Sequence, residues 1–433
     1  MSTEQEEGEH KARPYRTFEQ KPNATNNFNR NIRKRSKSRI EKFRESIFFS
    51  RATCATLCAA KKRMAQTILI TGGAGFVGSF VADELLSHGY SVRALDCLDV
   101  QVHADGRPDY LSGEVELFDG DIRDPSVVRR ALDGADGVFH LAALVGVGQS
   151  MYQIERYTSV NNLGTAVLLE ALVEHPVEKL IVASSMSLYG EGLYRRADGS
   201  LVQNAERTLA QLQARHWEPC DVGGEVLTPI PTPETKTPAL SSVYALSKFD
   251  QERLCLIAGR AYGFDALALR FFNIYGPRQA LSNPYTGVLA IFAARFLNDR
   301  APLINEDGRQ MRDFIHVRDI ARACRLALES QNCGGEAFNI GSGRALSVCQ
   351  IADELARAVG KSHIEPEIVG KYRAGDIRHC FADISKARHR FGFEPQIELR
   401  EGLEELAQWL ESQTAEDRVE SAARELSSRG LSI

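Results

Sequence analysis

Three side chains of this sequence have the chemistry to move a proton together. Tyr244 and Lys248 are four residues apart, so on a helix they lie one turn apart on the same face. Ser185 directly follows a buried apolar run, where its hydroxyl could bond a substrate oxygen, although a lone serine in such a turn is as a rule a structural cap. A phenol is a poor base at neutral pH, and we expect the Lys248 ammonium to lower the pKa of Tyr244.

A glycine loop nearer the N-terminus predicts a dinucleotide site. Gly72 and Gly75 lie between the apolar run 68–70 and the amphipathic stretch 76–88, and Gly78 lies in the first turn of that stretch. The first glycine permits a tight turn, the second lets backbone N–H groups approach a pyrophosphate, and the third allows the helix to pack closely on the strand. A plain glycine turn is the alternative.

Acidic residues after the next two predicted strands refine this prediction. Asp96 ends the strand 91–95 and is placed to accept hydrogen bonds from an adenosine ribose. A carboxylate there would repel a 2′-phosphate, so NAD is favoured over NADP. Asp121 and Ile122 follow the strand 115–118 and could hold the adenine, or Asp121 could cap a helix.

The elements that must position these residues alternate between strand and helix. Such an order is typical of a parallel sheet covered by helices on both faces. The predicted strands are 68–70, 91–95, 115–118, 137–141, 179–183 and 266–270, and the predicted helices are 76–88, 125–132, 161–174 and 242–262. We therefore predict the α/β class with a doubly wound sheet.

Composition limits the class of protein. The chain has 433 residues, 43% of them hydrophobic, which suffices for a large core in one or two domains. No apolar stretch reaches the roughly 20 residues that a membrane span needs. Nine scattered cysteines suit a reducing cytoplasm, and we expect no metal site. Cys54 and Cys58, with His10, form one weak metal candidate.

Residues 1–63 differ from the rest in charge, with 16 basic and 7 acidic residues in a chain whose net charge is −4. This segment lacks a sustained apolar face and is predicted to be a disordered arm. Attraction to nucleic acid or to a membrane surface is the alternative, and we do not expect nucleic acid to be a partner. A third interpretation makes Met64 the natural start, because the first strand begins just after it.

Ordered motifs across residues 66–411 make the chain resemble the extended short-chain dehydrogenases/reductases, specifically the nucleotide-sugar epimerases and dehydratases. The matching segments are 71–78, 140–143, 184–185, 244–248, 270–278, 312–317 and 373–377. Further stretches are similar to those of dTDP-L-rhamnose 4-epimerases, namely 95–103, 107–111, 145–152 and 278–287.

The resemblance implies a Rossmann-type fold and a full set of site residues. Residues 64–279 would be mainly the NAD-binding domain, 280–412 an interleaved substrate-binding lobe and 413–433 a C-terminal tail. A homodimer would form through helices 161–174 and 242–262. The implied catalytic residues are Ser185, Tyr244 and Lys248. The implied cofactor-binding residues are Gly72, Gly75, Phe76, Val77, Gly78, Asp96, Asp121, Ile122, Leu141, Ala142, Ala143, Asn161, Tyr244, Lys248 and Phe271. The implied substrate-binding residues are Ser185, Ser187, Asn273, Arg312, Arg373 and Asp376.

The residues after Ser185 narrow the reaction. The dehydratases of this family carry an Asp-Glu pair there to remove water, whereas this chain has Met186 and Ser187. We therefore expect a 4-epimerase, in which Tyr244 takes the proton of the sugar 4-hydroxyl and NAD takes and returns a hydride through a 4-keto sugar. An NAD-dependent reductase or dehydrogenase, or a non-catalytic NAD-binding scaffold, remains an alternative.

The span 190–241 is longer than a compact family member needs between the serine and the tyrosine. It includes Trp217 and Cys220. We expect it to be a lid over the sugar pocket, with a passive surface excursion as the alternative.

Overall fold

The computed structural model describes residues 66–104, 106–285, 287–373 and 375–432. The predicted basic arm, with Cys54 and Cys58, lies outside these ranges. Residues 65–433 form one compact unit. Among the described helices, none has both the length and the apolar character that crossing a membrane requires.

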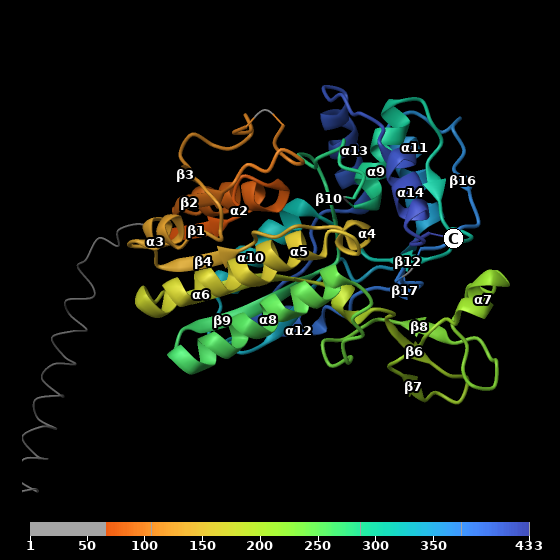
Figure 1. Ribbon diagram of the computed structural model, residues 1–433, viewed down its shortest axis with the longest axis horizontal. Coiled ribbons are helices and arrows are strands. Elements are labelled where there is room, and N and C mark those ends of the chain that lie inside the picture. Colours follow the sequence, from red (N-terminus) through yellow and green to blue (C-terminus); the bar gives the residue numbers. More distant parts are fainter. Residues whose placement is uncertain (1–65, 105, 286, 374, 433) are drawn as a thin grey trace, which may run out of the picture. The chain divides into compact units, whose positions relative to one another are not determined.

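A parallel sheet of seven strands forms the centre of this unit, in the order β14-β9-β5-β4-β1-β2-β3 (Figure 1). The strands are β1 (Thr67–Thr71), β2 (Ser91–Asp96), β3 (Glu116–Asp119), β4 (Gly137–His140), β5 (Lys179–Ser185), β9 (Asp265–Phe271) and β14 (Ala337–Ile340). The predicted α/β class and all six predicted strands are confirmed, and β14 is an additional strand from the C-terminal half. The chain reverses its direction of winding between β1 and β4, which opens a crevice at their carboxyl ends.

Alternating side chains of the strands build one core on each face of the sheet. Ile68 and Ile70 face α2 (Phe76–Ser87) and α10 (Val317–Glu329), whereas Leu69 faces the other layer. That other layer consists of α3 (Pro125–Leu132), α6 (Gly164–Glu174) and α8 (Val243–Tyr262), and Figure 1 shows α6 and α8 alongside each other. The four predicted helices are confirmed, except that the stretch predicted as 161–174 opens with a π-helical turn, Thr158–Leu163.

The C-terminal half adds a third apolar core beside the sheet. Its helices are α9 (Val288–Leu297), α11 (Val348–Ala358) and α13 (Leu399–Leu410). Short strands link this part to the sheet: β10 (Asn273–Tyr275) pairs with β13 (Phe314–His316), and β12 (Met311–Arg312) lies between β15 (Leu346–Ser347) and β17 (His379–Cys380). A further pair is formed by β11 (Leu303–Ile304) and β16 (Glu367–Ile368), and α12 (Ser385–Phe391) packs beside β14.

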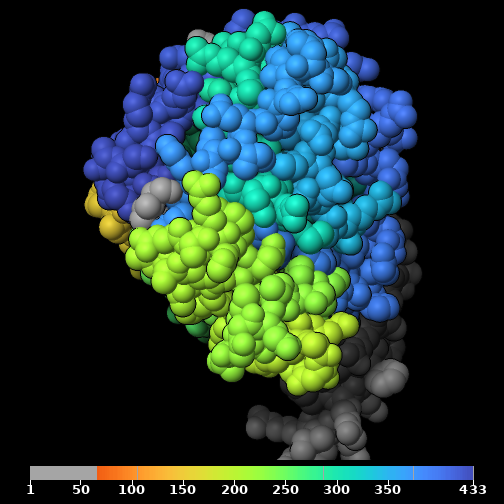
Figure 2. Space-filling model, turned by 90° about the vertical axis from the view of Figure 1, so that its right-hand side faces the viewer, coloured from red at the N-terminus to blue at the C-terminus, as the bar shows by residue number. Residues whose placement is uncertain are grey.

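Two other regions matter for the site. The short helices α4 (Val147–Ser150) and α5 (Ile154–Tyr157) follow β4, and α14 (Val419–Ser428) forms within the predicted C-terminal tail. The long insertion folds into a small antiparallel sheet of β6 (Leu193–Arg195), β7 (Leu201–Val202) and β8 (Thr228–Ile230). The short helix α7 (Leu209–Gln213) lies between β7 and β8 in the chain. Figure 2 shows the insertion as a yellow-green bulge beside the blue C-terminal half.

Candidate active site

A cavity of about 850 Å³ opens at the carboxyl edge of the sheet. Gly72 lies just after β1, Asp96 ends β2, Leu141 follows β4, Ser185 ends β5 and Phe271 ends β9, and all five line this cavity. The other predicted site residues that line it are Gly75, Phe76, Val77, Gly78, Asp121, Ile122, Ala142, Ala143, Ser187, Tyr244, Lys248, Asn273, Arg312, Arg373 and Asp376. Residues separated by some 300 positions in the sequence therefore share one space, and Asn161 is the predicted member that does not border it.

The glycine loop fits the pyrophosphate of a dinucleotide. Gly72 has φ +72°, which favours glycine, and a Cβ on Gly78 would lie 2.2 Å from the Gly72 carbonyl oxygen. Gly75 is the N-cap of α2, and no side chain caps the helix there. The first N–H groups of α2 therefore have no side-chain acceptor and are available to an anion at the cavity wall, as binding of NAD requires.

Both predicted acidic residues of the adenosine end lie in the cavity wall. The Asp96 carboxylate accepts hydrogen bonds from the backbone N–H groups of Ala74 and Leu98, each at 3.0 Å, and is thereby held in place. Asp121 forms an ion pair with Arg123, with Oδ2 and Nη2 2.5 Å apart, and this bond lowers the pKa of the carboxyl. The alternative that Asp121 caps a helix is wrong, because Asp124 caps α3.

The proton-transfer residues converge from two elements. Tyr244 and Lys248 lie on the inner face of α8, 8% and 3% exposed. The Tyr244 backbone N–H donates to Ser150 Oγ at 3.0 Å, which ties the start of α8 to the end of α4. Ser185 donates to Ser187 Oγ at 3.1 Å and accepts from the Ser187 N–H, also at 3.1 Å. The strand end and the helix therefore present their hydroxyls to the same cavity.

Burial controls the protonation of this group. Desolvation raises the pKa of Tyr244, and a hydrogen bond with Ser185 acts in the opposite direction. Burial lowers the pKa of Lys248 to about 8, and its ammonium donates to Gln251 Oε1 at 2.6 Å. In the protein without its cofactor, the pKa of Tyr244 is therefore raised, because desolvation outweighs the groups that would lower it. A positive charge brought by the cofactor would lower the pKa of Tyr244.

A buried polar chain supports Lys248 from behind. Gln251 Nε2 lies 3.1 Å from His140 Nε2, and His140 Nδ1 lies 2.8 Å from Thr71 Oγ1. Burial lowers the pKa of His140 to about 3, so this histidine is neutral at physiological pH. The sequence-based reasoning missed Gln251, although its position three residues after Lys248 places it on the same helix face.

Asn161 is predicted to line the cofactor, but it is fully buried behind the cavity wall. Its side chain accepts from Leu144 N–H at 2.8 Å and donates to the Leu144 carbonyl at 3.1 Å and to Ser247 Oγ at 2.9 Å. Asn161 therefore fixes the loop after β4, which does line the cavity, to α8.

The far end of the cavity carries two guanidinium groups. It also carries a buried side-chain oxygen that accepts no hydrogen bond. Arg312 donates to the backbone carbonyls of Met311 and Arg378 at 2.9 and 3.0 Å, which holds its side chain in the wall. Arg373 forms a half-exposed ion pair with Asp376 at 3.0 Å. The Asn273 side-chain oxygen is buried and accepts no hydrogen bond, so a ligand that donates would satisfy it.

The C-terminal segment contributes residues that the sequence-based reasoning missed. The contributing residues of α14 and the turn after it are Val419, Ala422, Ala423, Leu426, Ser427, Leu431 and Ser432. Their spacing of three and four residues was the pattern in the sequence that could have revealed them. Glu306, Gln310 and Lys371 also line the cavity and were not predicted.

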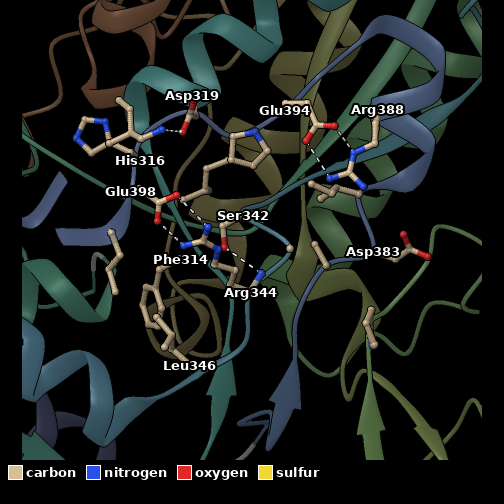
Figure 3. Close-up of a pocket in the computed structure, with 18 of the residues that line it drawn as sticks. Phe314, His316, Asp319, Ser342, Arg344, Leu346, Asp383, Arg388, Glu394 and Glu398 are labelled. Atoms are coloured by element: carbon tan, nitrogen blue, oxygen red, sulfur yellow. Dashed lines mark hydrogen bonds and ion pairs between the residues drawn. The ribbon is translucent and has the colours of Figure 1, made fainter. Parts of the chain in front are cut away.

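A second cavity, of about 540 Å³, lies elsewhere in the C-terminal half and contains none of the predicted site residues. Figure 3 shows its two arginines, Arg344 and Arg388, paired with Glu398 and Glu394. Both positive charges are paired with carboxylates, whereas Arg312 of the first cavity donates to backbone carbonyls.

The fold and the large cavity together are those of a dinucleotide-dependent α/β enzyme. The model of the NAD-dependent epimerase/dehydratase family matches residues 68–209 and 220–341. The chain belongs to this family and is an NAD-dependent nucleotide-sugar 4-epimerase of the isomerase class. Its cofactor is NAD.

Known proteins with this fold are similar over most of the chain. The dTDP-L-rhamnose 4-epimerase of Burkholderia thailandensis is 35% identical, covering 80% of this chain and 95% of the relative. The crystal structure of the Thermotoga maritima UDP-glucose 4-epimerase with UDP-glucose is 31% identical with a TM-score of 0.65, covering 80% of this chain and 99% of that one. The Bacillus cereus UDP-glucuronic acid 4-epimerase, in complex with UDP-glucuronic acid and NAD, is 28% identical with a TM-score of 0.64, with the same shares covered.

Proposed function

We propose that the protein inverts C4 of a dTDP- or UDP-linked hexose, with dTDP-L-rhamnose as the first candidate. The observation that carries this proposal is the placement of Ser185, Tyr244 and Lys248 in one cavity between the glycine loop and the two arginines. The similarity to a dTDP-L-rhamnose 4-epimerase supports the choice of the first sugar.

Each member of the trio has a distinct part in the mechanism. Bound NAD would supply a positively charged ring that accepts a hydride from C4 and returns it. Tyr244 is the general base that takes the proton of the 4-hydroxyl and later gives it back, and Ser185 holds the same oxygen by a hydrogen bond. Lys248, fixed by Gln251, stabilises the phenolate.

The side chains next to Ser185 favour epimerisation over loss of water. Met186 is buried and Ser187 bonds to Ser185. Elimination of water requires an acid and a base beside the sugar, and neither of these side chains is a carboxylic acid. The 4-keto sugar formed after the first transfer therefore keeps its substituents and is reduced again.

We assign the nucleotide diphosphate to the far end of the cavity. Arg312 and Arg373 would bind its phosphates with planar, charged donors, and Asn273 would accept a hydrogen bond from the ligand. Asp376 would orient Arg373 through their ion pair. This anchor at one end allows the keto sugar to turn and present its other face.

A homodimer through α6 and α8 is part of the proposal. Leu246, Leu254 and Ile257 are exposed by 47%, 36% and 57%, and their spacing places them on one face of α8. Val173 of α6 is 44% exposed beside it. Ile257→Asp should then give monomers in sedimentation analysis.

The seven described cysteines are free, which supports the cytoplasm as the place of action.

The test compares Tyr244→Phe with Tyr262→Phe, which alters an exposed tyrosine at the other end of the same helix. Purified protein is incubated with dTDP- and UDP-sugars without added NAD, and the products are identified by NMR. We expect Tyr244→Phe to lose activity by a factor of about 10²–10⁴ and Tyr262→Phe to retain it. Full activity in Tyr244→Phe would contradict the mechanism. A product that forms only with stoichiometric NADH would indicate a reductase instead.

A further inference from the structure

One face of the C-terminal helix α14 borders the active-site cavity. Val419, Ala422, Ala423 and Leu426 recur at the spacing of a single helix face, and all four line the cavity. Ser421 and Arg424, on the other face, are exposed and do not line it. The helix therefore presents small and apolar side chains to the ligand space.

The position of α14 places it beside the reacting end of the cavity. A Cβ on Gly148 would lie only 3.3 Å from Leu426, so α14 packs directly on α4. The last residue of α4, Ser150, accepts the hydrogen bond from the Tyr244 backbone. At the other end of the segment, Ser432 pairs with Arg373 in an antiparallel bridge. The segment thus extends from the neighbourhood of Tyr244 to the proposed diphosphate anchor.

Polar contacts fix α14 at both of its ends. Arg295 is 5% exposed and pairs with Asp417 at 3.1 Å and with Glu420 at 3.2 Å, just before and at the start of the helix. At the C-terminal end, the Arg429 guanidinium lies 4.3 Å from the centre of the Tyr152 ring. Two anchors on different elements hold the apolar face against the cavity.

We propose that residues 417–432 form a wall of the sugar site and that α14 determines which nucleotide sugars fit. This inference rests on the proposed function. The α14 face offers no charge or hydrogen-bonding group apart from Ser427, so it suits a sugar with an apolar edge, such as the methyl group of a 6-deoxyhexose. A sugar with a carboxylate at C6 is disfavoured, because its charge would be buried here without a partner.

The experiment introduces a large side chain on the cavity face of α14 and compares its effect with that of the same side chain on the opposite face. Ala423→Trp places a large side chain in the cavity, and Ser421→Trp places the same side chain in solvent two residues earlier. Steady-state kinetics with dTDP-L-rhamnose, UDP-glucose and UDP-glucuronate are measured together with NAD content and the unfolding temperature. We expect Ala423→Trp to lower kcat/KM for dTDP-L-rhamnose at least tenfold, mainly through KM, with NAD content unchanged. Ser421→Trp should stay within twofold of the original chain.

A charge substitution tests the specificity directly. Ala423→Arg should raise the ratio of kcat/KM for UDP-glucuronate to that for dTDP-L-rhamnose, because it supplies the missing cation. If the original chain is active and all three variants have the same kinetics as it does, the proposed wall is overturned. The proposed function then still stands.

If the original chain inverts none of the three sugars, the proposed function is contradicted. Calorimetric Kd values for the same three nucleotides then decide the inference. A weaker Kd in Ala423→Trp than in Ser421→Trp supports the wall, and equal Kd values overturn it.

Discussion

The insertion 190–241 and the C-terminal segment 413–432 stand in opposite relations to the active site. The insertion is long and conspicuous in the sequence, yet none of its residues lines the cavity. The C-terminal segment is short, and five of the ten residues of its helix α14 line the cavity. The lid role of the insertion stays a prediction.

A buried charge cluster joins the insertion to the C-terminal half of the chain. Arg378 is fully buried and pairs with Glu218 of the insertion and with Glu306, at 2.9 Å from Glu306 Oε2. Arg207 of the insertion also binds Glu306, at 2.7 Å. Glu306 lines the cavity, so the insertion reaches the site through this carboxylate. The comparison teaches that a segment's length in the sequence does not tell whether it supports a site or borders it.

The largest expected effect concerns the charge cluster. Arg378→Met leaves the buried Glu306 without one of its two arginines and should lower the free energy of unfolding by about 3–5 kcal/mol. Chemical denaturation measures this loss. Arg388→Met removes a half-exposed pair with Glu394 and is the control, and its denaturant midpoint should change little. Equal losses in the two variants would remove the distinction between a buried clamp and a surface pair.

Removal of residues 413–433 should affect the substrate more than the fold. We expect kcat/KM to fall at least about tenfold, equivalent to ~1.4 kcal/mol of transition-state stabilisation, because the cavity loses a wall. Bound NAD and the unfolding of the remaining chain should change little. The kinetics and the unfolding temperature of the truncated protein are measured in parallel. A truncated protein with unchanged KM would show that α14 only covers the surface.

Acid should release the insertion from the buried charge cluster. Burial raises the pKa of Glu218, but hydrogen bonds from His379 and Arg378 outweigh this and lower the pKa to about 2. The stabilisation is therefore complete above the unfolded-state pKa of about 4.3 and is lost as the pH falls toward 2. Trp217 precedes Glu218 and reports the release by fluorescence in a Trp409→Phe background. Glu218→Gln should remove the acid transition between these pH values, and an unchanged transition would contradict this assignment.

The smallest effect is expected at the outer surface of the insertion. Arg196 and Asp221 form an ion pair of 3.9 Å in which the arginine side chain is 37% exposed. Arg196→Ala should change the free energy of unfolding by about 0–1 kcal/mol, since the arginine is well exposed to water and the two groups are 3.9 Å apart. The denaturant midpoint measures this change. A loss comparable to that of Arg378→Met would mean that the whole insertion, not its buried base, carries the stability.

Local patterns were enough to predict most of the sheet. Most strands from β1 to β9 in the main sheet have an apolar centre, and the glycines at 72 and 78 mark the turn between strand and helix. By contrast, β14 has four residues and pairs with β9, some seventy positions earlier. A four-residue run does not specify such a distant partner, because pairing depends on the assembled edge of the sheet.

The sequence by itself determined the kinds of side chain in the site and the order of the elements that carry them, because both follow from local periodicity and residue chemistry. Only the tertiary structure decided that Asn161 supports the cavity from behind and that α14 closes it. It also decided the direction of the Tyr244 pKa shift, since burial raises this pKa although a hydrogen bond with Ser185 acts in the opposite direction. Exclusion of water and contacts between distant segments cause these outcomes, and neither is encoded in a short stretch of residues.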